Sequence, residues 1–313
     1  MKIKTIFFSL LILMIVFAGC KKEESDYDKQ VKIDDGKIEK YLADKKISAN
    51  LAPEGYYYQK IKENTDGEVI SKNDVVTFYY SMRLLDGSEL DTYMDTLQSP
   101  LLFKQGSNAL WPKGLDMGIK KMHVGEHYRF YLPSYLAYYD YSLNDYFPIF
   151  SNFIIDIKVT GIASETEIQD IELDSIKSFI AKEEYENADK YASGLYYIET
   201  EEGDGNKPTT GDYVTIHFTR KYLDGTVIES TENKPVSFYL GSNKAIEGLQ
   251  DGIRLMKEGG KAILIMPSKI AFGKSLQVLP IGLREEMYEE NILLYDVEPY
   301  SPVLYEVELI EAK

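Results

Sequence analysis

The hydrophobic positions of the chain follow a helical period in two places. Each place has a triplet of apolar residues spaced i, i+3, i+4, which is one face of an amphipathic helix. The two triplets are Ile38, Tyr41 and Leu42, and Ile176, Phe179 and Ile180. We therefore expect helices over about 35–48 and 172–190.

Segments in which apolar and polar residues alternate follow each of these helices, and such alternation predicts half-buried strands. The clearest segments are GYYYQKI (55–61), VVTFYYSMRLL (75–85), GLYYIET (194–200) and YVTIHFTRKYL (213–223). An Asp-Gly turn ends the second strand of each half, because glycine supplies the positive φ that a type I′ turn needs. We expect a further short strand after each turn, short helices near 115–122 and 249–256, and two closing strands in each half.

The two halves are copies of one pattern. A shift of the sequence by about 138 positions places Asp86-Gly87 on Asp224-Gly225 and Asp91 on Glu229. The sequence therefore predicts an α+β fold with two tandem domains. Each domain is expected to be an antiparallel sheet of about five strands wrapped on a short helix and preceded by an N-terminal helix.

The spacing of the two copies differs only between their predicted elements. LPSYLAY (132–138) matches MPSKIAF (266–272), and the second copy then carries a long insert within 274–298. Length differences of this kind are typical of loops.

The first residues have the layout of a secretory signal. Lys2 and Lys4 are followed by an apolar run over 5–17 and by Ala18-Gly19 before Cys20. The apolar run is too short for a comfortable membrane-spanning helix. FAGC closely resembles the bacterial lipobox, in which the cysteine is acylated and its acyl chains anchor the protein. The alternative is an ordinary signal peptide followed by an unmodified cysteine.

The expected domain organisation follows from this layout. We expect a lipoprotein signal peptide over 1–19, a flexible tether over 20–30, a first domain over 31–163 and a second over 164–313. The tether is charged and has no apolar period. The sequence thus predicts a cell-envelope, outer-membrane lipoprotein whose Cys20 binds the lipid bilayer, with the membrane face left open.

Composition narrows the possible partners and cofactors. A formal net charge of −16 argues against nucleic-acid binding, which normally needs a basic face. One cysteine excludes an intrachain disulfide framework. His123 and His127 have helical i, i+4 spacing, but Gly125 lies between them and no cysteine is near, so we expect no metal site.

Both halves carry the same ordered motifs. The first reads VTFYY, LDGSELD, GLDMGIKKM and LPSYLAY, and the second reads VTIHFT, LDGTVIEST, GLQDGIRLMKEGG and MPSKIAFG. These motifs resemble the FKBP-type (immunophilin) peptidyl-prolyl isomerases over about 55–163 and 194–313. The resemblance implies that Leu90-Asp91 and Ile228-Glu229 each point into a substrate pocket. It also implies that the partners are proline-containing polypeptides.

The chemistry of prolyl isomerisation needs no metal, cofactor or nucleophile. Its barrier comes from amide resonance, about 18–20 kcal/mol for a typical peptide bond. An apolar cradle removes the water that favours the polar planar amide. A few fixed hydrogen-bond donors and polar side chains supply the rest.

The resemblance assigns one pocket to each half. In the first half, Tyr80, Asp91 and Tyr138 are the expected catalytic positions. The expected substrate-binding positions there are Leu90, Leu101, Phe103, Leu110, Trp111, Leu115 and Ile155. Leu115 departs from the family pattern, which has a large aromatic floor, and the WPKG stretch is one residue longer than usual.

In the second half the expected substrate-binding positions are Phe218, Ile228, Glu229, Val236, Phe238, Ile246, Leu249, Phe272 and Tyr305. Both tyrosine hydroxyls are lost, because Phe218 and Phe272 replace Tyr80 and Tyr138. We therefore expect the first half to be the more active copy and the second to bind. The alternative is that these aromatic residues only form the core and that the two acids only accept structural hydrogen bonds.

Three functions are consistent with the sequence. The first, which we expect, is a lipid-anchored prolyl isomerase that assists the folding of envelope proteins. The second is a catalytically inert binding, chaperone or assembly lipoprotein of the same fold. The third is a surface lipoprotein that binds glycans or host protein through the tyrosine-rich stretch 135–147. The tandem motifs disfavour the third, and the retained Tyr80, Asp91 and Tyr138 favour the first over the second.

Overall fold

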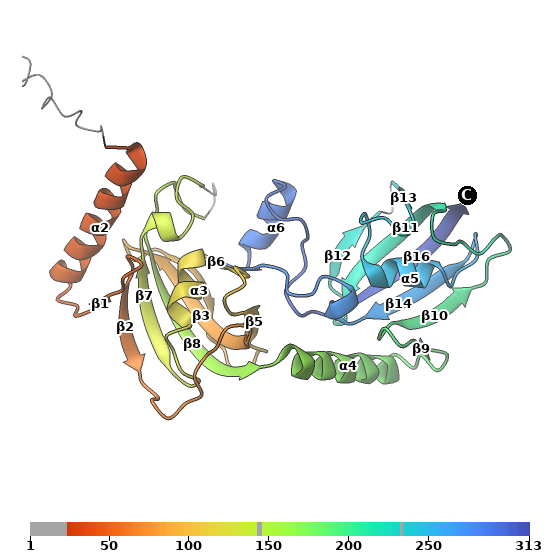
Figure 1. Cartoon of the computed structure of the whole chain (residues 1–313), viewed down its shortest axis with the longest axis horizontal. Coiled ribbons are helices and arrows are strands. Elements are labelled where there is room, and N and C mark those ends of the chain that lie inside the picture. Colours follow the sequence, from red (N-terminus) through yellow and green to blue (C-terminus); the bar gives the residue numbers. More distant parts are fainter. Residues whose placement is uncertain (1–23, 143–145, 232–233) are drawn as a thin grey trace, which may run out of the picture.

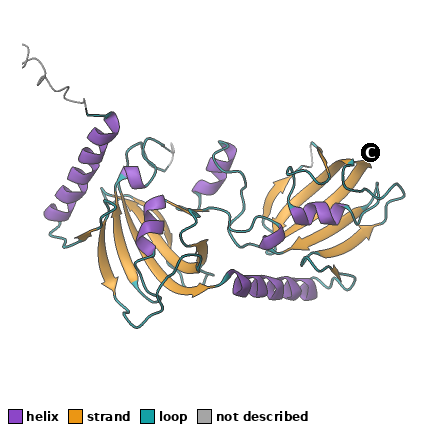
Figure 2. Ribbon diagram, viewed as in Figure 1, coloured by secondary structure: helices purple, strands orange, loops and turns teal. Residues whose placement is uncertain are grey.

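The computed structural model describes residues 24–142, 146–231 and 234–313. Within them the chain forms two domains that lie side by side along the longest axis of the molecule (Figure 1, Figure 2). Each has an antiparallel sheet, a short helix against it and a longer helix before it, which confirms the predicted α+β class. The predicted signal peptide and Cys20 lie outside the described residues. None of the helices in these ranges is long and apolar enough to cross a membrane.

The first domain is built on a seven-stranded sheet in the order β1-β2-β7-β8-β3-β4, with β5 paired to β3 as well. Its helices are α2 (Asp26–Asp44) and α3 (Lys113–Ile119), and its strands are β1 (Asn50–Leu51), β2 (Tyr57–Lys62), β3 (Val75–Leu84), β4 (Glu89–Tyr93), β5 (Leu101–Lys104), β6 (Leu110–Trp111), β7 (His127–Leu132) and β8 (Phe153–Ala163). The prediction of about five strands omits the very short β1 and β5.

The second domain repeats this sheet in the order β12-β11-β16-β14-β10-β9, with β13 paired to β11. Its helices are α4 (Glu165–Lys182), α5 (Glu247–Ile253) and α6 (Leu283–Glu289), and its strands are β9 (Asp189–Lys190), β10 (Tyr196–Glu201), β11 (Tyr213–Tyr222), β12 (Val227–Ser230), β13 (Val236–Tyr239), β14 (Lys261–Met266), β15 (Gln277–Val278) and β16 (Val303–Ala312). Strand β15 and helix α6 belong to residues 274–298, which we call the insert. The Leu279–Pro280 bond of the insert and the Trp111–Pro112 bond are cis.

Alternation along the central strands builds each core. In β3, Phe78, Tyr80 and Met82 are almost fully buried and pack in one cluster with the side chains of α3. Helix α3 lies very close to the sheet, since a Cβ added at Gly118 would lie 2.5 Å from the ring of Phe130. Glycine at this position therefore allows the close approach of helix and sheet.

The two longer helices pack against their sheets through residues of the apolar triplets from which they are predicted. Ile38 and Leu42 of α2 are buried against Tyr131 and Ile154 of the first sheet. Ile176 of α4 is buried in the same manner against four side chains of the second sheet, which are Tyr196, Ile198, Ile265 and Leu304.

The bounds of both helices differ from the prediction because polar caps determine where they begin. Helix α2 begins at Asp26, where the side chain of Ser25 accepts a hydrogen bond from the Asp28 N–H, so the predicted tether over 20–30 is wrong for residues 26–30. Helix α4 begins at Glu165 through a capping box of Ser164 and Glu167. Because β8 ends at Ala163, one residue joins the first sheet to α4.

Candidate active site

The first domain gathers its predicted pocket residues into one apolar cluster. Tyr80 comes from β3, Leu90 and Asp91 from β4, and Tyr138 from the segment that follows β7. The apolar and tyrosine members of the cluster are Tyr80, Leu90, Leu101, Phe103, Leu110, Trp111, Leu115, Tyr138 and Ile155. Asp91 joins them by accepting a hydrogen bond from the Tyr80 hydroxyl.

The two tyrosine hydroxyls of this cluster remain protonated at neutral pH. Burial and the hydrogen bond to Asp91 both raise the pKa of Tyr80 far above its usual value. Burial likewise raises the pKa of Tyr138. Trp111 stacks on Tyr138 with ring centroids 5.8 Å apart, and its indole N–H donates to the Ala137 carbonyl at 3.1 Å. Both tyrosines can therefore donate hydrogen bonds from fixed positions.

The insert of the second domain fills this pocket. Strand β15 pairs in parallel with β6, and the N–H of Leu279 donates to the Trp111 carbonyl at 2.9 Å. Four side chains of the insert are fully buried in the same cluster as the pocket residues: Val278, Leu279, Leu283 and Met287. Helix α6 accordingly stands between the two domains in Figure 1.

The polar residues of the pocket bind the backbone of the insert. The Tyr138 hydroxyl donates to the carbonyl oxygen of Leu279 at 2.6 Å. The N–H of Ile281 donates to the Tyr80 hydroxyl oxygen at 2.9 Å and to Asp91 Oδ2 at 3.1 Å. Pro280 lies between these two contacts and is buried. The predicted catalytic side chains thus surround a leucyl-prolyl peptide unit of the same chain.

The second domain has an open cavity of about 730 Å³ at the equivalent position. Eight of the nine residues predicted for this pocket line it, which are Phe218, Glu229, Val236, Phe238, Ile246, Leu249, Phe272 and Tyr305. Ile228 does not line it and packs against the neighbouring core. The insert contributes Tyr288, Leu294 and Tyr295 to another wall of this cavity.

Arg220 is a pocket residue that the sequence reasoning missed. It donates to the Tyr305 hydroxyl at 3.1 Å, forms an ion pair with Glu229 at 2.8 Å and lies 4.6 Å from the ring centre of Phe272. Burial raises the pKa of Tyr305 to about 12, although the charge of Arg220 opposes this. The signal was available, because strand alternation places Arg220 on the same face as Phe218.

The tyrosine-rich stretch 135–147 contacts the insert and the core. Leu136, Tyr138 and Phe147 are buried, and the Tyr141 hydroxyl donates to Glu290 of the insert at 2.5 Å. The described part of this stretch is therefore not the open aromatic surface that the third predicted function requires.

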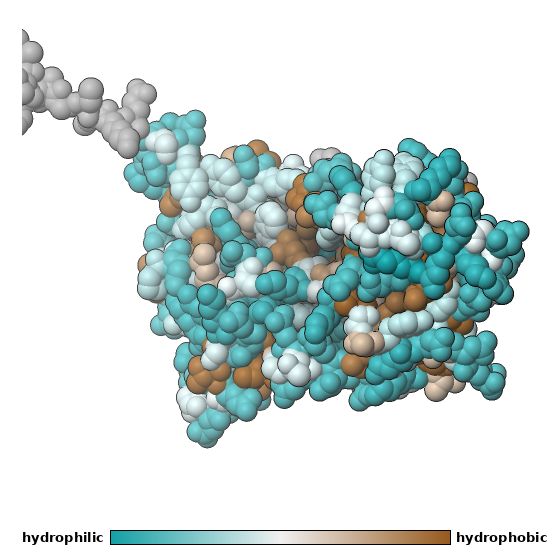
Figure 3. Space-filling model, turned by 45° about the vertical axis from the view of Figure 1, so that its right-hand side comes forward, coloured by the Kyte–Doolittle hydropathy of each residue, from teal (hydrophilic) through white to brown (hydrophobic). Residues whose placement is uncertain are grey.

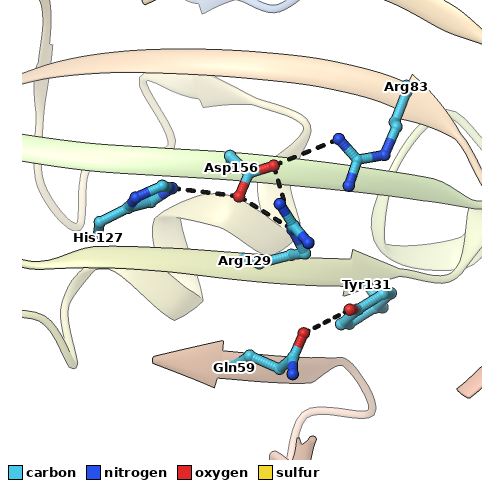
Figure 4. A network of polar contacts seen from close by, with 6 residues as sticks. All are labelled: Gln59, Arg83, His127, Arg129, Tyr131 and Asp156. Atoms are coloured by element: carbon cyan, nitrogen blue, oxygen red, sulfur yellow. Dashed lines mark hydrogen bonds and ion pairs between the residues drawn. The ribbon is translucent and has the colours of Figure 1, made fainter. Parts of the chain in front are cut away.

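His127, one of the two histidines considered as metal ligands in the sequence, belongs to a network of polar contacts. His127 Nε2 lies 3.1 Å from Asp156 Oδ1, and the same carboxylate accepts from Arg129 Nε at 3.0 Å and pairs with Arg83 at 3.5 Å (Figure 4). This network joins β3, β7 and β8 on the sheet face opposite the pocket. Among the described residues, no group of three or more His, Cys, Asp or Glu side chains is placed to hold a metal ion.

Comparison with known proteins agrees with both domains. Residues 67–160 and 204–310 match the family described as FKBP-type peptidyl-prolyl cis-trans isomerase. A probable FKBP-type peptidyl-prolyl cis-trans isomerase FkpA of Neisseria meningitidis is 35% identical over 109 residues, which are 34% of this chain and 37% of that protein. The outer membrane protein MIP of Legionella longbeachae is 35% identical over 97 residues, which are 30% of this chain and 41% of that protein.

The chain therefore spans less than half the length of each of these two relatives. Among solved structures, the three FKBP domains of wheat FKBP73 align with a TM-score of 0.33 and 21% identity, covering 85% of this chain and 99% of that one. The two matched segments together make up more than half of the chain. The chain belongs to the FKBP-type peptidyl-prolyl cis-trans isomerase family.

Proposed function

We propose that the protein is a lipid-anchored prolyl isomerase of the cell envelope that acts on proline-containing polypeptides, with the first domain as the more active copy. One observation carries the proposal. Tyr138 binds the carbonyl that precedes Pro280, while Tyr80 and Asp91 bind the N–H that follows it. A substrate with an X-Pro-X backbone can make the same three contacts.

These contacts suit isomerisation because the polar side chains orient the peptide while the apolar side chains remove water from it. The hydroxyl of Tyr138 orients the amide by its oxygen, and Tyr80 with Asp91 fixes the residue that follows the proline. The surrounding apolar side chains, such as Phe103, Leu115 and Ile155, exclude water. Water favours the polar planar amide, so its exclusion lowers the energy needed to twist the bond.

The envelope location rests on the N-terminal sequence and on relatives. Cys20 stands at the acylation position of a lipobox-like FAGC, and one relative is named an outer membrane protein. Metabolic labelling with a palmitate analogue tests the anchor, with Cys20→Ala as the variant expected to lose the label. Equal labelling of both proteins would contradict lipidation at Cys20.

A second candidate function for the second domain is peptide binding without catalysis. Its cavity keeps the apolar wall but has Phe218 and Phe272 where the first domain has tyrosine hydroxyls. Arg220, a charged side chain in this cavity, is already paired with Glu229 and Tyr305.

The test of the isomerase proposal is the rate at which the full chain, in detergent, isomerises a short X-Pro peptide. The measurement is made on the native chain and on a Leu279→Asp/Met287→Asp variant, because the insert of the native chain competes with the peptide. Acceleration that disappears in Asp91→Leu would support a working site in the first domain. Uncatalysed rates with both folded proteins would contradict the proposal.

A further inference from the structure

We propose that the insert is an intrachain ligand of the first domain's pocket, so that a free peptide binds there only after the insert has left. That the competing peptide contains proline rests on the proposed function. The contact between the insert and the first pocket rests on geometry alone. The insert is then the regulator of the first pocket. In this conformation the second pocket is the one that is open to peptides.

The insert uses the contacts that a peptide would need. Leu279 O is bonded to Tyr138, and the Ile281 N–H is bonded to Tyr80 and Asp91. A peptide cannot bind these side chains while the insert holds them. The two ligands therefore compete for the same atoms and exclude each other.

Apolar burial adds to these hydrogen bonds. Val278, Leu279, Leu283 and Met287 each have 0% of their surface exposed. Removing such side chains from water is the main favourable contribution to association. The side chains lie in β15, in α6 and in the link between them, so the docked surface extends over residues 278–287 and is not a single loop tip.

The insert is also held in shape by contacts within the second domain. The Tyr300 N–H donates to the Gly273 carbonyl at 2.9 Å, and Ser275 Oγ donates to the Val297 carbonyl at 2.6 Å. The buried Arg284 donates to the carbonyls of Leu276 and Val297. These bonds close the base of the insert and present it to the first pocket at a high effective concentration.

The insert has a second face that borders the open pocket. Tyr295 packs edge-to-face on Phe272 with ring centroids 5.0 Å apart, and Tyr288 and Leu294 line the same cavity. The space-filling view shows hydrophobic residues in a recess near the middle of the molecule (Figure 3). The insert therefore fills the first pocket and forms part of the wall of the second.

The chain contains a built-in reporter of this docking. Trp111 is its single tryptophan, its backbone pairs with Val278, and its ring stacks on Tyr138. Tryptophan emission therefore follows the first pocket directly and does not depend on catalysis.

The experiment measures Trp111 emission and peptide binding by calorimetry in the full chain in detergent. The released variant is Leu279→Asp/Met287→Asp, and Leu283→Asp alone is a milder second variant should the double change prevent folding. Ile292→Asp is the matched control, because it makes the same kind of change in the insert at a side chain that is 39% exposed. The probe is the synthetic peptide Gln-Val-Leu-Pro-Ile-Gly-Leu, which copies residues 277–283.

We expect the released variant to shift Trp111 emission to longer wavelength and the peptide to reverse that shift. The peptide should bind the released variant at least about tenfold more tightly than the native chain, because the competent state is rare while the insert is docked. Ile292→Asp should behave like the native chain. A released variant with native circular dichroism and unchanged Trp111 emission would overturn the proposal, and so would equal peptide affinity in both proteins.

Failure of the isomerase proposal looks different. In that case the released variant gains peptide binding and the Trp111 shift but does not accelerate isomerisation. The insert would then still be the ligand of the first pocket, and only the catalytic role would be lost.

Discussion

Tyr138 supplies one buried hydroxyl to the first pocket, and its removal is a single-atom test of the site. In the released background, Tyr138→Phe should lower kcat/KM for an X-Pro peptide by about three- to tenfold, because a typical hydrogen bond contributes about 1 kcal/mol. Tyr191→Phe, at a side chain that is 37% exposed, is the matched control. An unchanged kcat/KM in Tyr138→Phe would remove that hydroxyl from the reaction.

At the residue scale, the sequence predicts which side chains lie together in each pocket but not which groups those side chains bind. The family resemblance implies which positions gather in each domain, and the repeated motif order carries them from one copy to the other. Arg220 escapes that reasoning because its counterpart is the apolar Met82, and only the strand period reveals that it faces the pocket. The hydroxyl of Tyr138 could be assigned to a pocket, but not to the carbonyl of Leu279.

Helix docking rests on a buried acid that both domains repeat. Asp34 of α2 accepts hydrogen bonds from the N–H and hydroxyl of Ser134, and Glu172 of α4 accepts the same pair from Ser268. The serines belong to the LPS and MPS motifs of the two copies. The side chain of Glu172 is almost fully buried, and this burial raises its pKa.

Ser268→Ala should therefore destabilise the second domain. The change leaves the buried carboxylate of Glu172 with only the backbone donor, and an unmade hydrogen bond to a buried group costs about 1–3 kcal/mol. Urea unfolding followed by circular dichroism measures the loss. Ser178→Ala, on the exposed part of the same helix, should change the free energy of unfolding by less than about 0.5 kcal/mol.

A second element-scale prediction concerns the network that joins β3, β7 and β8. Burial alone would raise the pKa of Asp156, but hydrogen bonds from His127 and Arg129 and the charges of Arg129 and Arg83 outweigh it, so the pKa lies below its ordinary value of 3.8. The carboxylate thus stabilises the fold above the unfolded-state pKa. That contribution is lost as the pH falls through the lower folded-state pKa.

Asp156→Asn should consequently cost about 2–3 kcal/mol at pH 7, the size of a hydrogen bond to a charged group. The difference between native and variant stability should shrink as the pH falls below about 4. Urea midpoints measured from pH 7 to pH 2.5 follow this difference. A constant gap over that range would show that the ionised carboxylate is not what stabilises the three strands.

The sequence predicts which helices and strands form better than it predicts where each of them begins and ends. Period-two and helical patterns locate the central strands and both long helices. The starts of α2 and α4 are missed because Ser25 and Ser164 set them through polar caps, which the apolar period does not contain. The short β15 is formed only by pairing with β6 of the other domain, so no local pattern could predict it.

The position of the insert is the main feature of the whole molecule that the sequence cannot provide. The apolar residues of 276–287 must be buried, but either domain offers an apolar surface. In the structure the two domains are joined by the one-residue junction at Ser164 and by contacts of α4 with both of them. Tyr300 of the second domain, for example, donates to Glu165 at 3.2 Å, and Lys104 of the first domain pairs with the same carboxylate at 2.8 Å.

The docked insert should also stabilise the first domain. Leu283→Ala removes buried methyl groups at the contact, and substitutions of this kind typically cost about 2–5 kcal/mol in a core that cannot relax. We expect a loss toward the lower end of that range, because the insert can detach. Urea unfolding followed by Trp111 emission reports the first pocket together with the docked insert, and a midpoint equal to that of the native chain would contradict the prediction.

Because Tyr288, Leu294 and Tyr295 line the second cavity while the opposite side of the same segment is docked in the first, the two pockets share one equilibrium. A ligand that fills the second cavity and prefers one position of the segment must change peptide affinity at the first pocket by some factor. By thermodynamic linkage, a ligand at the first pocket changes affinity at the second by the same factor. If the insert leaves the first pocket as we propose, the duplicated domain would behave as a two-site switch, in which a ligand in the second cavity changes access to the first pocket.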